Sequence, residues 1–290
     1  MLNEVLEIIK NNSKSELKNL KILDGTLGLG GYSEAFLKNF PESFILGIDR
    51  DEKAINFSIE RLKNFGERFK TAQKNFSEID PANIFDVYVF DLGVSNMQLT
   101  DSERGFSFQN DGPLDMRMNS SDENLLTAQE VLENYDEKFL AKIFWEYGEE
   151  KFSRQIAKAV KNSRKPLKTT GDLVNLIRET LPKPLQRKMG THPARRVFQA
   201  LRIFVNNETG ELENLLKNLE KFNHKCLIIF VSYHSLEDRL IKKTFRQWQT
   251  DSKGKILTRH PLTPTENEIE ENYKARSAKL RAFLKSAAAF

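Results

Sequence analysis

Short apolar runs alternate with amphipathic helical patterns along the first ninety residues of the chain. Strand-like runs are expected at Lys21–Asp24, at Phe44–Ile48 ending in Asp49, and at 84–90 ending in Asp91, with a weaker one near 68–72. The segments between them, 2–9, 32–39 and 52–63, repeat their apolar residues at helical spacing. Strands that alternate with helices predict βαβ units and a mostly parallel sheet.

This alternation stops for about a hundred residues and then returns. Thr127 and Glu130 form a capping-box pattern that opens a helix, and further helical patterns follow at 137–147, 150–163 and 171–180. The apolar run 226–232 then predicts a fully buried strand, followed by a helix at 236–248 and two late strands at 255–260 and 277–284. The pattern predicts a doubly wound α/β domain, residues 1–102 and 196–290, interrupted by an inserted helical domain, residues 103–195.

Composition narrows the class of protein. A chain of 290 residues with 39% hydrophobic residues is large and apolar enough to bury a substantial core. Its one cysteine, Cys226, gives neither a disulfide framework nor a cysteine metal site, and no other residue spacing predicts a metal. The first residues lack the basic and apolar regions of a signal peptide, and the longest apolar run is too short to cross a bilayer. We therefore expect a cytoplasmic protein.

The net charge of +4 hides an uneven distribution of charged residues. Between Lys151 and Val205 there are 14 Lys or Arg residues and two acids, whereas residues 101–150 hold 13 acids and 4 bases. A concentrated basic block is typical of a surface that binds a polyanion such as RNA. The alternative is a pair of solvated helix faces with no partner.

A glycine-rich loop follows the first strand. Asp24-Gly25-Thr26-Leu27-Gly28-Leu29-Gly30-Gly31 lies between a strand and a helix, and the second strand ends in Asp49. Glycines let the backbone approach a ligand, and the start of a helix offers N–H donors. A carboxylate at the end of the second strand is placed to accept the ribose hydroxyl protons of an adenosyl ligand.

The spacing of this loop favours one adenosyl cofactor over another. The dinucleotide fingerprint is G-x-G-x-x-G, whereas this chain has Gly28-x-Gly30-Gly31 preceded by the acid Asp24. That acid suits the cationic amino group of S-adenosylmethionine and would repel a pyrophosphate. An NAD-dependent oxidoreductase is the alternative enzyme class, and a tight turn without a ligand is the alternative for the loop itself.

Three further residues are candidates for the same pocket: Phe76, Asp91 and Gln98. Open α/β sheets bind ligands at the carboxyl ends of their strands, where Asp91 falls. The ring of Phe76 could cover an adenine, or it could be a simple core residue.

Several segments together carry a family resemblance. They are the Asp24–Gly31 loop, Asp91–Ser95, Arg104–Phe108, Asp111–Met118, Phe198–Asn206 and His234–Arg239. With these segments the chain resembles the bacterial ribosomal RNA small subunit methyltransferase H family, also called MraW. The Asp111–Met118 and His234–Arg239 strings are the most specific.

The resemblance implies a class I S-adenosylmethionine-dependent methyltransferase that methylates N4 of a cytosine in the decoding region of 16S ribosomal RNA. The partner it implies is the small ribosomal subunit, with the insert as the substrate-recognition domain. The cofactor contacts that it implies are Gly30, Gly31, Tyr32, Asp49, Phe76, Asp91 and Gln98. Tyr32 stands where the family usually has His, and Asn96 stands where it usually has a second Ser.

Two residues are candidates for the chemistry, Asp91 and His234. Asp91 could accept a hydrogen bond from the amino group of the base, bind the cofactor or cap the strand. His234 could lie at the pocket floor, or it could belong to a local network in which Ser235 caps the next helix and Glu237 or Asp238 pairs with Arg239.

Substrate contacts are expected from the insert. Asp111, Asp115 and Arg117 lie on a loop that would fit a lip over the target base, although Asp115 and Arg117 could instead form an ion pair that fixes the loop. The basic candidates for RNA contact are Arg187, Lys188, Arg195 and Arg196. His192-Pro193 is interpreted as a helix start. A non-catalytic RNA-binding protein remains a rival class, and the oligomeric state stays open, with a homodimer as one alternative.

Overall fold

The computed structural model describes residues 1–12, 18–122 and 124–287. It divides the chain into two compact units, Met1–Gly93 with Thr209–Phe290 and Val94–Glu208. We call the first the sheet unit and the second the insert unit. The insert unit contains the whole of the predicted insert, and each unit is described by itself below.

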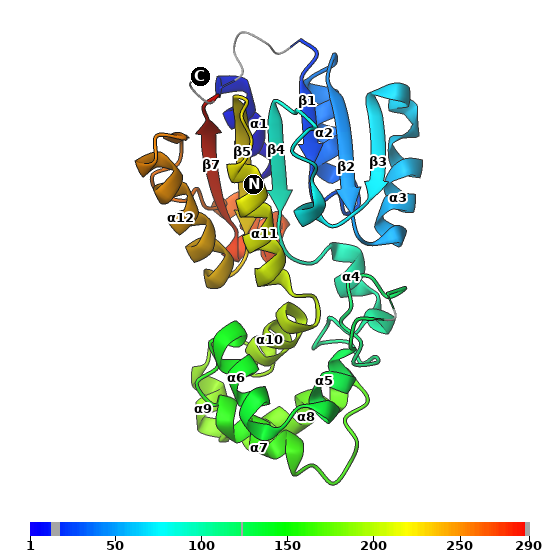
Figure 1. The fold of residues 1–290 in the computed structure, drawn as a ribbon. Helices are drawn as coiled ribbons and strands as arrows, with labels where there is room; N and C mark the ends of the chain where they lie inside the picture. The colour runs from blue at the N-terminus through cyan, green and yellow to red at the C-terminus, as the bar shows by residue number, and fades with distance from the viewer. Residues whose placement is uncertain (13–17, 123, 288–290) are drawn as a thin grey trace. The chain divides into compact units, whose positions relative to one another are not determined.

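A seven-stranded sheet forms the centre of the sheet unit (Figure 1). Its strands are β1 (Lys21–Asp24), β2 (Phe44–Asp49), β3 (Phe69–Gln73), β4 (Val87–Asp91), β5 (Cys226–Ser232), β6 (Gly254–Ile256) and β7 (Lys279–Lys285). The strand order is β3-β2-β1-β4-β5-β7-β6. The first five strands pair in parallel, and β7 pairs antiparallel to both β5 and β6. The order reverses between β1 and β4, which is where open α/β sheets bind ligands.

Helices cover both faces of this sheet. The helices of this unit are α1 (Leu2–Asn12), α2 (Gly31–Asn39), α3 (Glu52–Leu62), α11 (Glu208–Glu220), α12 (Ser235–Thr250) and α13 (Glu266–Glu271), with short 3-10 helices at Lys63–Arg68, Phe76–Glu78 and Tyr273–Ser277. α13 buries none of its residues. Alternate residues of β4 and β5 enter opposite cores, because successive strand side chains point to opposite faces. Val87 and Val89 pack in one core with α1 and α2, and Tyr88 and Phe90 pack in the other with α11 and α12.

The structure confirms the predicted alternation and corrects several boundaries. β4 begins at Val87 rather than at residue 84, because Ile84 is 59% exposed and lies outside the sheet core. The late strands are shorter than expected, and they form an antiparallel pair in which β7, the later one in sequence, lies between β5 and β6.

The insert unit is helical and has its own hydrophobic core. Its helices are α4 (Asn96–Thr100), α5 (Ala128–Asn134), α6 (Glu137–Gly148), α7 (Ser153–Lys161), α8 (Thr170–Thr180), α9 (Lys183–Lys188) and α10 (Arg195–Val205), with a 3-10 turn at Ser102–Arg104. Thr127 caps α5 through the predicted capping box with Glu130. Expected helix 150–163 begins later, at Ser153, because Glu150 is fully buried and accepts a hydrogen bond from the Phe152 N–H.

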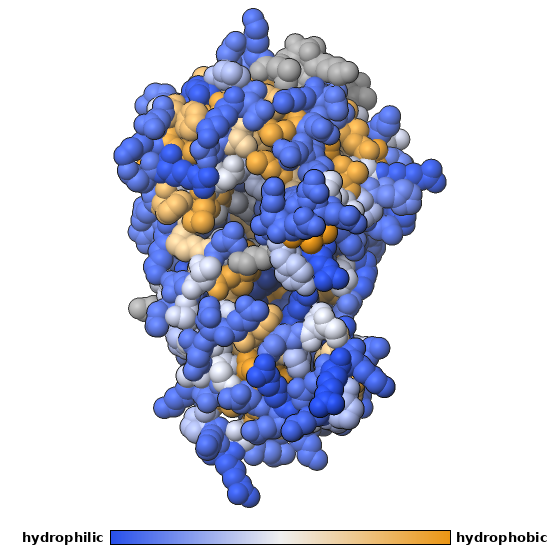
Figure 2. All heavy atoms as spheres, turned by 180° about the vertical axis from the view of Figure 1, so that it is seen from behind, coloured by the Kyte–Doolittle hydropathy of each residue, from blue (hydrophilic) through white to orange (hydrophobic). Residues whose placement is uncertain are grey.

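Most of the face in Figure 2 is hydrophilic, as expected when the apolar sides of helices are buried in cores. Large exposed apolar residues are scattered, among them Trp145 at 58%. Within the described parts of the chain, no helix combines the length and hydropathy that a membrane span requires.

Candidate cofactor and RNA sites

Three carboxylates lie at the carboxyl edge of the parallel strands in the sheet unit. Asp24 ends β1, Asp49 ends β2 and Asp91 ends β4. β1 pairs in parallel with both β2 and β4, so these strand ends share one edge of the sheet. The expected grouping of strand-end acids is therefore present.

The loop between Asp24 and Gly31 is held by its own backbone and by two neighbouring side chains. Gly30 lies in the left-handed region, with φ of 76°, and α2 starts immediately after it. A Cβ at Gly25 would overlap the ring of Phe90, which explains why the chain needs glycine directly after β1. Ser58 donates a hydrogen bond to the carbonyl of Gly28 at 2.9 Å. The loop is thus preorganised at the start of α2, with an exposed Gly31 at its end.

Asp24 is buried at the base of this loop, with 1% of its surface exposed. Its Oδ2 accepts a hydrogen bond from the Ser33 hydroxyl at 2.7 Å. Burial raises the pKa of Asp24 to about 6, against the lowering effect of that hydrogen bond. The side chain of Asp24 therefore interacts most favourably with a cationic neighbour.

Asp49 holds the same loop from the second strand. One carboxylate oxygen accepts from the Gly28 N–H at 2.8 Å, and the other accepts from the Asp51 N–H at 2.9 Å. Burial raises its pKa, and the two backbone donors lower it. Asp49 thus has a structural task in the loop besides the ribose contact that we expect of it.

Asp91 is joined to two residues that the sequence interpretation missed, Thr26 and Tyr233. The Asp91 N–H donates to the Thr26 hydroxyl at 2.6 Å, and the Tyr233 hydroxyl donates to Asp91 Oδ1 at 2.9 Å. Burial raises the pKa of Asp91 to about 7, while the Tyr233 hydrogen bond opposes the rise. Tyr233 follows β5 directly, so the rule that ligands bind at strand ends was the signal that could have found it.

Tyr32 and Phe76 lie at the margins of this edge. The ring of Tyr32 packs near Phe36 and the α1–α2 core, and burial together with the charge of Asp91 raises the pKa of its hydroxyl. Phe76 begins a 3-10 turn. Its ring packs edge-on against that of Phe90, with the ring centroids 6.4 Å apart. It is half-buried against the α11–α12 core, so part of its ring packs while part remains accessible.

Gln98 belongs to the insert unit. It lies in α4 and is 5% exposed, and its side chain accepts the Ser95 N–H at 3.0 Å in a capping box. Its cofactor contact stays a prediction.

His234 is the cap of α12, which corrects the expectation that Ser235 would cap this helix. The His234 Nδ1 accepts from the Glu237 N–H at 3.5 Å, and its Nε2 lies 3.0 Å from the Glu237 carboxylate. Asp238 forms an ion pair with Arg281, in which Arg281 Nε and Asp238 Oδ1 lie 2.6 Å apart. These contacts support the local network over a catalytic role for His234.

The loop of residues 111–118, at the start of the insert, is fixed by contacts within the insert unit. Arg117 and Asp115 form a two-bond ion pair, each bond 2.8 Å long. Asp111 accepts from the Gly171 N–H at 2.8 Å, which ties the loop to the start of α8 and lowers the pKa of its carboxyl. Met116 is fully buried in the insert core. The ion-pair alternative is therefore present, and contact of this loop with a base stays a prediction.

The four basic candidates of the insert are all exposed: Arg187, Lys188, Arg195 and Arg196. The first two lie on α9 and the last two begin α10. α10 begins at Arg195 with Ala194 as its N-cap, so the helix starts later than the predicted His192-Pro193 and Pro193 lies outside its first turn. The ring of His192 stacks on Phe108 with ring centroids 4.7 Å apart.

The carboxylates at the sheet edge fit S-adenosylmethionine. Asp24 and Asp91 are acids with raised pKa values, and among the described residues neither has a Lys or Arg partner in a hydrogen bond or ion pair. A cationic ligand would favour their charged forms. This sheet also differs from an all-parallel dinucleotide-binding sheet, because β7 runs antiparallel to β5. The fold and the site together define a class I S-adenosylmethionine-dependent methyltransferase, and S-adenosylmethionine is its cofactor.

Comparison with known proteins then gives the family. Residues 1–286 match the MraW methylase family, and the chain belongs to that family. A protein of Picosynechococcus named ribosomal RNA small subunit methyltransferase H is 46% identical over 261 residues, covering 89% of this chain and 88% of the relative. Relatives with the same name from Persephonella marina and Leptospira interrogans are 43% and 41% identical, covering 96% and 98% of this chain and 95% and 87% of their own lengths.

Replacing Asp49 should weaken the binding of S-adenosylmethionine. We expect Asp49→Ala to cost about 1.5–3 kcal/mol of binding free energy, the range for lost hydrogen bonds to a charged group. Asp49→Asn, which keeps the side-chain shape, should weaken binding in the same direction. Isothermal titration measures both, with the exposed Asp80→Ala as the control. An unchanged dissociation constant in folded Asp49 variants would remove this residue from the site.

Tyr233→Phe should change the pH dependence of cofactor binding. The Tyr233 hydrogen bond lowers the pKa of Asp91, so its loss should raise that pKa further. If binding needs ionised Asp91, affinity falls as pH drops through about 7 in the natural protein. In the variant the midpoint should lie about one pH unit higher.

Titrations at a series of pH values check this expectation. Tyr273→Phe, at a tyrosine that is 69% exposed, is the matched control and should leave the midpoint in place. Identical profiles for all three proteins would show that the Tyr233–Asp91 hydrogen bond does not govern binding.

Proposed function

We propose that this enzyme methylates N4 of a cytosine in the decoding region of 16S ribosomal RNA, on an assembled or nearly assembled small ribosomal subunit. The observation that carries the proposal is the match of residues 1–286, insert included, to the MraW methylase family. The name shared by the relatives gives the substrate class, and the acidic edge of the sheet supports the chemistry. We expect the enzyme to work in the cytoplasm with its ribosomal substrate.

Holding the cofactor is the task of the strand-end acids. Asp24 suits the amino group, Asp49 the ribose hydroxyls and the Gly30–Gly31 backbone the rest of the methionine part. Phe76, Tyr32 and Gln98 complete the proposed contacts. When bound, S-adenosylmethionine supplies a methyl group on a sulfonium sulfur. Fixed positions for the reacting groups provide much of the rate acceleration in such a displacement.

Asp91 is our candidate for assisting the nucleophile. The amino nitrogen of cytosine is a weak nucleophile, because its lone pair is delocalised into the ring. An acceptor that hydrogen-bonds one of its N–H groups favours a pyramidal nitrogen and stabilises the positive charge that develops there. The nitrogen gives up one proton after it forms the new C–N bond, and a carboxylate with a pKa of about 7 is suited to accept it. For His234, whose ring caps α12, we propose no step.

The basic block of the insert should carry affinity for RNA and not for the cofactor. Replacing Arg187, Lys188, Arg195 and Arg196 with Ala removes four exposed charges from α9 and α10. The slope of log Kd against log salt should then fall, because fewer counterions are released on binding. Filter binding of 16S ribosomal RNA at several salt concentrations measures the slope, and titration of S-adenosylmethionine serves as the control. An unchanged slope would leave the block as a solvated surface.

The preferred substrate should be a folded particle. A base must leave its stack before its amino group can meet the methyl donor, and an assembled RNA can present a displaced base. We expect methyl transfer to small subunits to exceed transfer to naked 16S ribosomal RNA, with little transfer to a short oligonucleotide of the same local sequence. Tritium transfer to the three substrates, with the modified base mapped by mass, tests both the site and the preference. Equal rates on all three would mean that local sequence suffices.

The same assay tests the non-catalytic alternative, because an RNA-binding protein without activity would bind subunits and transfer no tritium. The other alternative, an NAD-dependent oxidoreductase, does not agree with the match of residues 1–286 to the MraW methylase family. The edge of the sheet is also acidic where a pyrophosphate would lie.

A further inference from the structure

A stripe of basic side chains runs along α12 in the sheet unit. Arg239, Lys242, Lys243 and Arg246 recur at the spacing i, i+3, i+4 and i+7, which places them along one side of a helix. We call these four residues the α12 stripe. Three of them are exposed and Lys242 is half-buried. The apolar side of the helix, Ile241, Phe245 and Trp248, is buried in the core beneath the sheet.

Three residues of the α12 stripe, Lys242, Lys243 and Arg246, are not balanced by acids of their own helix. No acid occurs between Arg239 and Thr250, and the two acids of α12 lie buried in its first turn. Among the residues that the structure describes, no carboxylate forms an ion pair with Lys242, Lys243 or Arg246.

Other exposed lysines of the same unit do have acidic partners. Lys38 pairs with Glu34, Lys63 with Glu60 and Lys70 with Glu67. The lack of acidic partners at Lys242, Lys243 and Arg246 among the described residues is therefore not a general property of the surface of this unit.

Helix stability gives no reason for this arrangement. Cations three or four residues apart repel each other and weaken a helix, and the stripe contains four such pairs. The last turn of α12, where cations would favour the helix dipole, holds no basic residue. A polyanionic partner would supply counter-charge to these cations.

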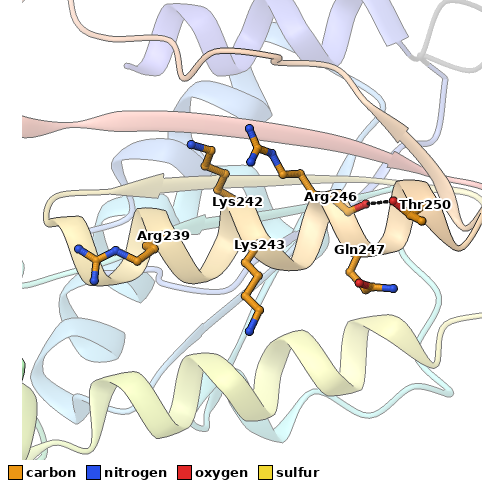
Figure 3. Close-up of a pocket in the computed structure, with 6 residues that line it drawn as sticks. All are labelled: Arg239, Lys242, Lys243, Arg246, Gln247 and Thr250. Carbon is orange, nitrogen blue, oxygen red and sulfur yellow. Dashed lines mark hydrogen bonds between the residues drawn. The ribbon is translucent and has the colours of Figure 1, made fainter.

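The stripe borders a shallow hollow of about 370 Å³. Its lining consists of Arg239, Lys242, Lys243, Arg246, Gln247 and Thr250. Figure 3 looks onto this face of α12 and shows Lys242 and Arg246 directed to one edge of the face and Lys243 and Gln247 directed to the other edge. Cations beside polar side chains are the groups that contact phosphate and sugar in nucleic-acid complexes.

The position of α12 relates the stripe to the reaction. The helix begins two residues after Tyr233, whose hydroxyl contacts Asp91 at the edge of the sheet. From Arg239 to Arg246 the helix rises about 10 Å, a length over which one strand of a duplex presents about three phosphates. The aromatic residues of α12 are buried, so the surface offers no stacking platform for bases.

We propose that the α12 stripe binds the sugar-phosphate backbone of the ribosomal RNA beside the target nucleotide. This proposal rests on the proposed function and adds a second RNA contact, on the catalytic unit itself, to the basic block of the insert. The contact is electrostatic and independent of base sequence.

The test compares three variants of the full-length enzyme. The triple variant Lys242→Ala, Lys243→Ala, Arg246→Ala removes three charges and leaves Arg239 in place. A charge-conserving variant, Lys242→Arg, Lys243→Arg, Arg246→Lys, keeps them. The matched control, Lys38→Ala, Lys63→Ala, Lys70→Ala, removes three charges whose side chains have acidic partners. Thermal unfolding and S-adenosylmethionine titration check each protein for folding.

Binding of naked 16S ribosomal RNA and of small subunits is measured across a salt series. In the triple alanine variant the slope of log Kd against log salt should fall by about 2 to 3, as expected when three phosphate contacts are lost. The charge-conserving and control variants should keep the natural slope. The KM for subunits should rise in the alanine variant, while the dissociation constant for S-adenosylmethionine stays the same.

Three outcomes overturn the proposal. An unchanged slope in a folded alanine variant makes the stripe a solvated surface. An equal fall in the control variant makes the effect one of net charge alone. A loss of affinity for subunits with none for naked RNA identifies an acidic ribosomal protein as the partner instead. Because binding is measured separately from methyl transfer, a natural enzyme that fails to methylate the subunit counts against the proposed function and not against this contact.

Discussion

The parallel pairing of β1 with β2 and β4 is the constraint on which the site depends. It places the ends of three strands, and with them Asp24, Asp49 and Asp91, at one edge of the sheet. Burying carboxylates there is unfavourable for their charged forms, as the raised pKa values of Asp24 and Asp91 indicate. The same cost makes the edge receptive to a cation. A positively charged cofactor stabilises the ionised forms of these acids, so the fold favours such a cofactor over a neutral or anionic one.

The glycine loop and Tyr233 refine that edge in different ways. The loop is closed by Asp49 through the Gly28 N–H, so one carboxylate both shapes the backbone and stands where the ribose is expected. Tyr233, arriving from the end of β5, gives Asp91 a hydrogen-bond donor. A donor to the ionised form keeps the Asp91 pKa from rising further, close to the range useful for accepting a proton. Positioning of the acid and tuning of its protonation come from one contact.

The Asp111–Met118 string of the insert is explained largely by contacts inside the insert unit. Arg117 is fixed by Asp115, Met116 is buried, and Asn206 hydrogen-bonds the backbone of both Met116 and Met118 at 2.7 Å. Strong sequence patterns in a methyltransferase insert therefore need not mark contacts with the substrate. The exposed cations of α9 and α10 are better placed for an RNA partner, because their side chains lie at the surface and, of the four, only the Arg196 side chain hydrogen-bonds to a described residue, at the Glu149 carbonyl 3.0 Å away.

The sequence by itself determined the class of fold, the glycine loop and the acids at the strand ends. These features depend on local patterns: strand and helix periodicity, glycine at a turn, and an acid directly after an apolar run. It located the basic block as well, because charge density is a property of composition. The family resemblance was equally available from contiguous strings of residues.

Only the tertiary structure decided which partners those residues have. Tyr233 and Asp91 lie 142 positions apart, and Asp238 and Arg281 lie 43 apart, so no local pattern could pair them. His234, and not Ser235, is the N-cap of α12, because the backbone leaving β5 places the imidazole beside the first turn of the helix. The order of β6 and β7 in the sheet could not be predicted from the sequence either. It is set by the antiparallel pairing of β7 with β5, and no residue between β6 and β7 indicates that pairing. Long-range hydrogen bonding and burial are collective properties of the folded chain, and they set the protonation and the orientation on which the chemistry depends.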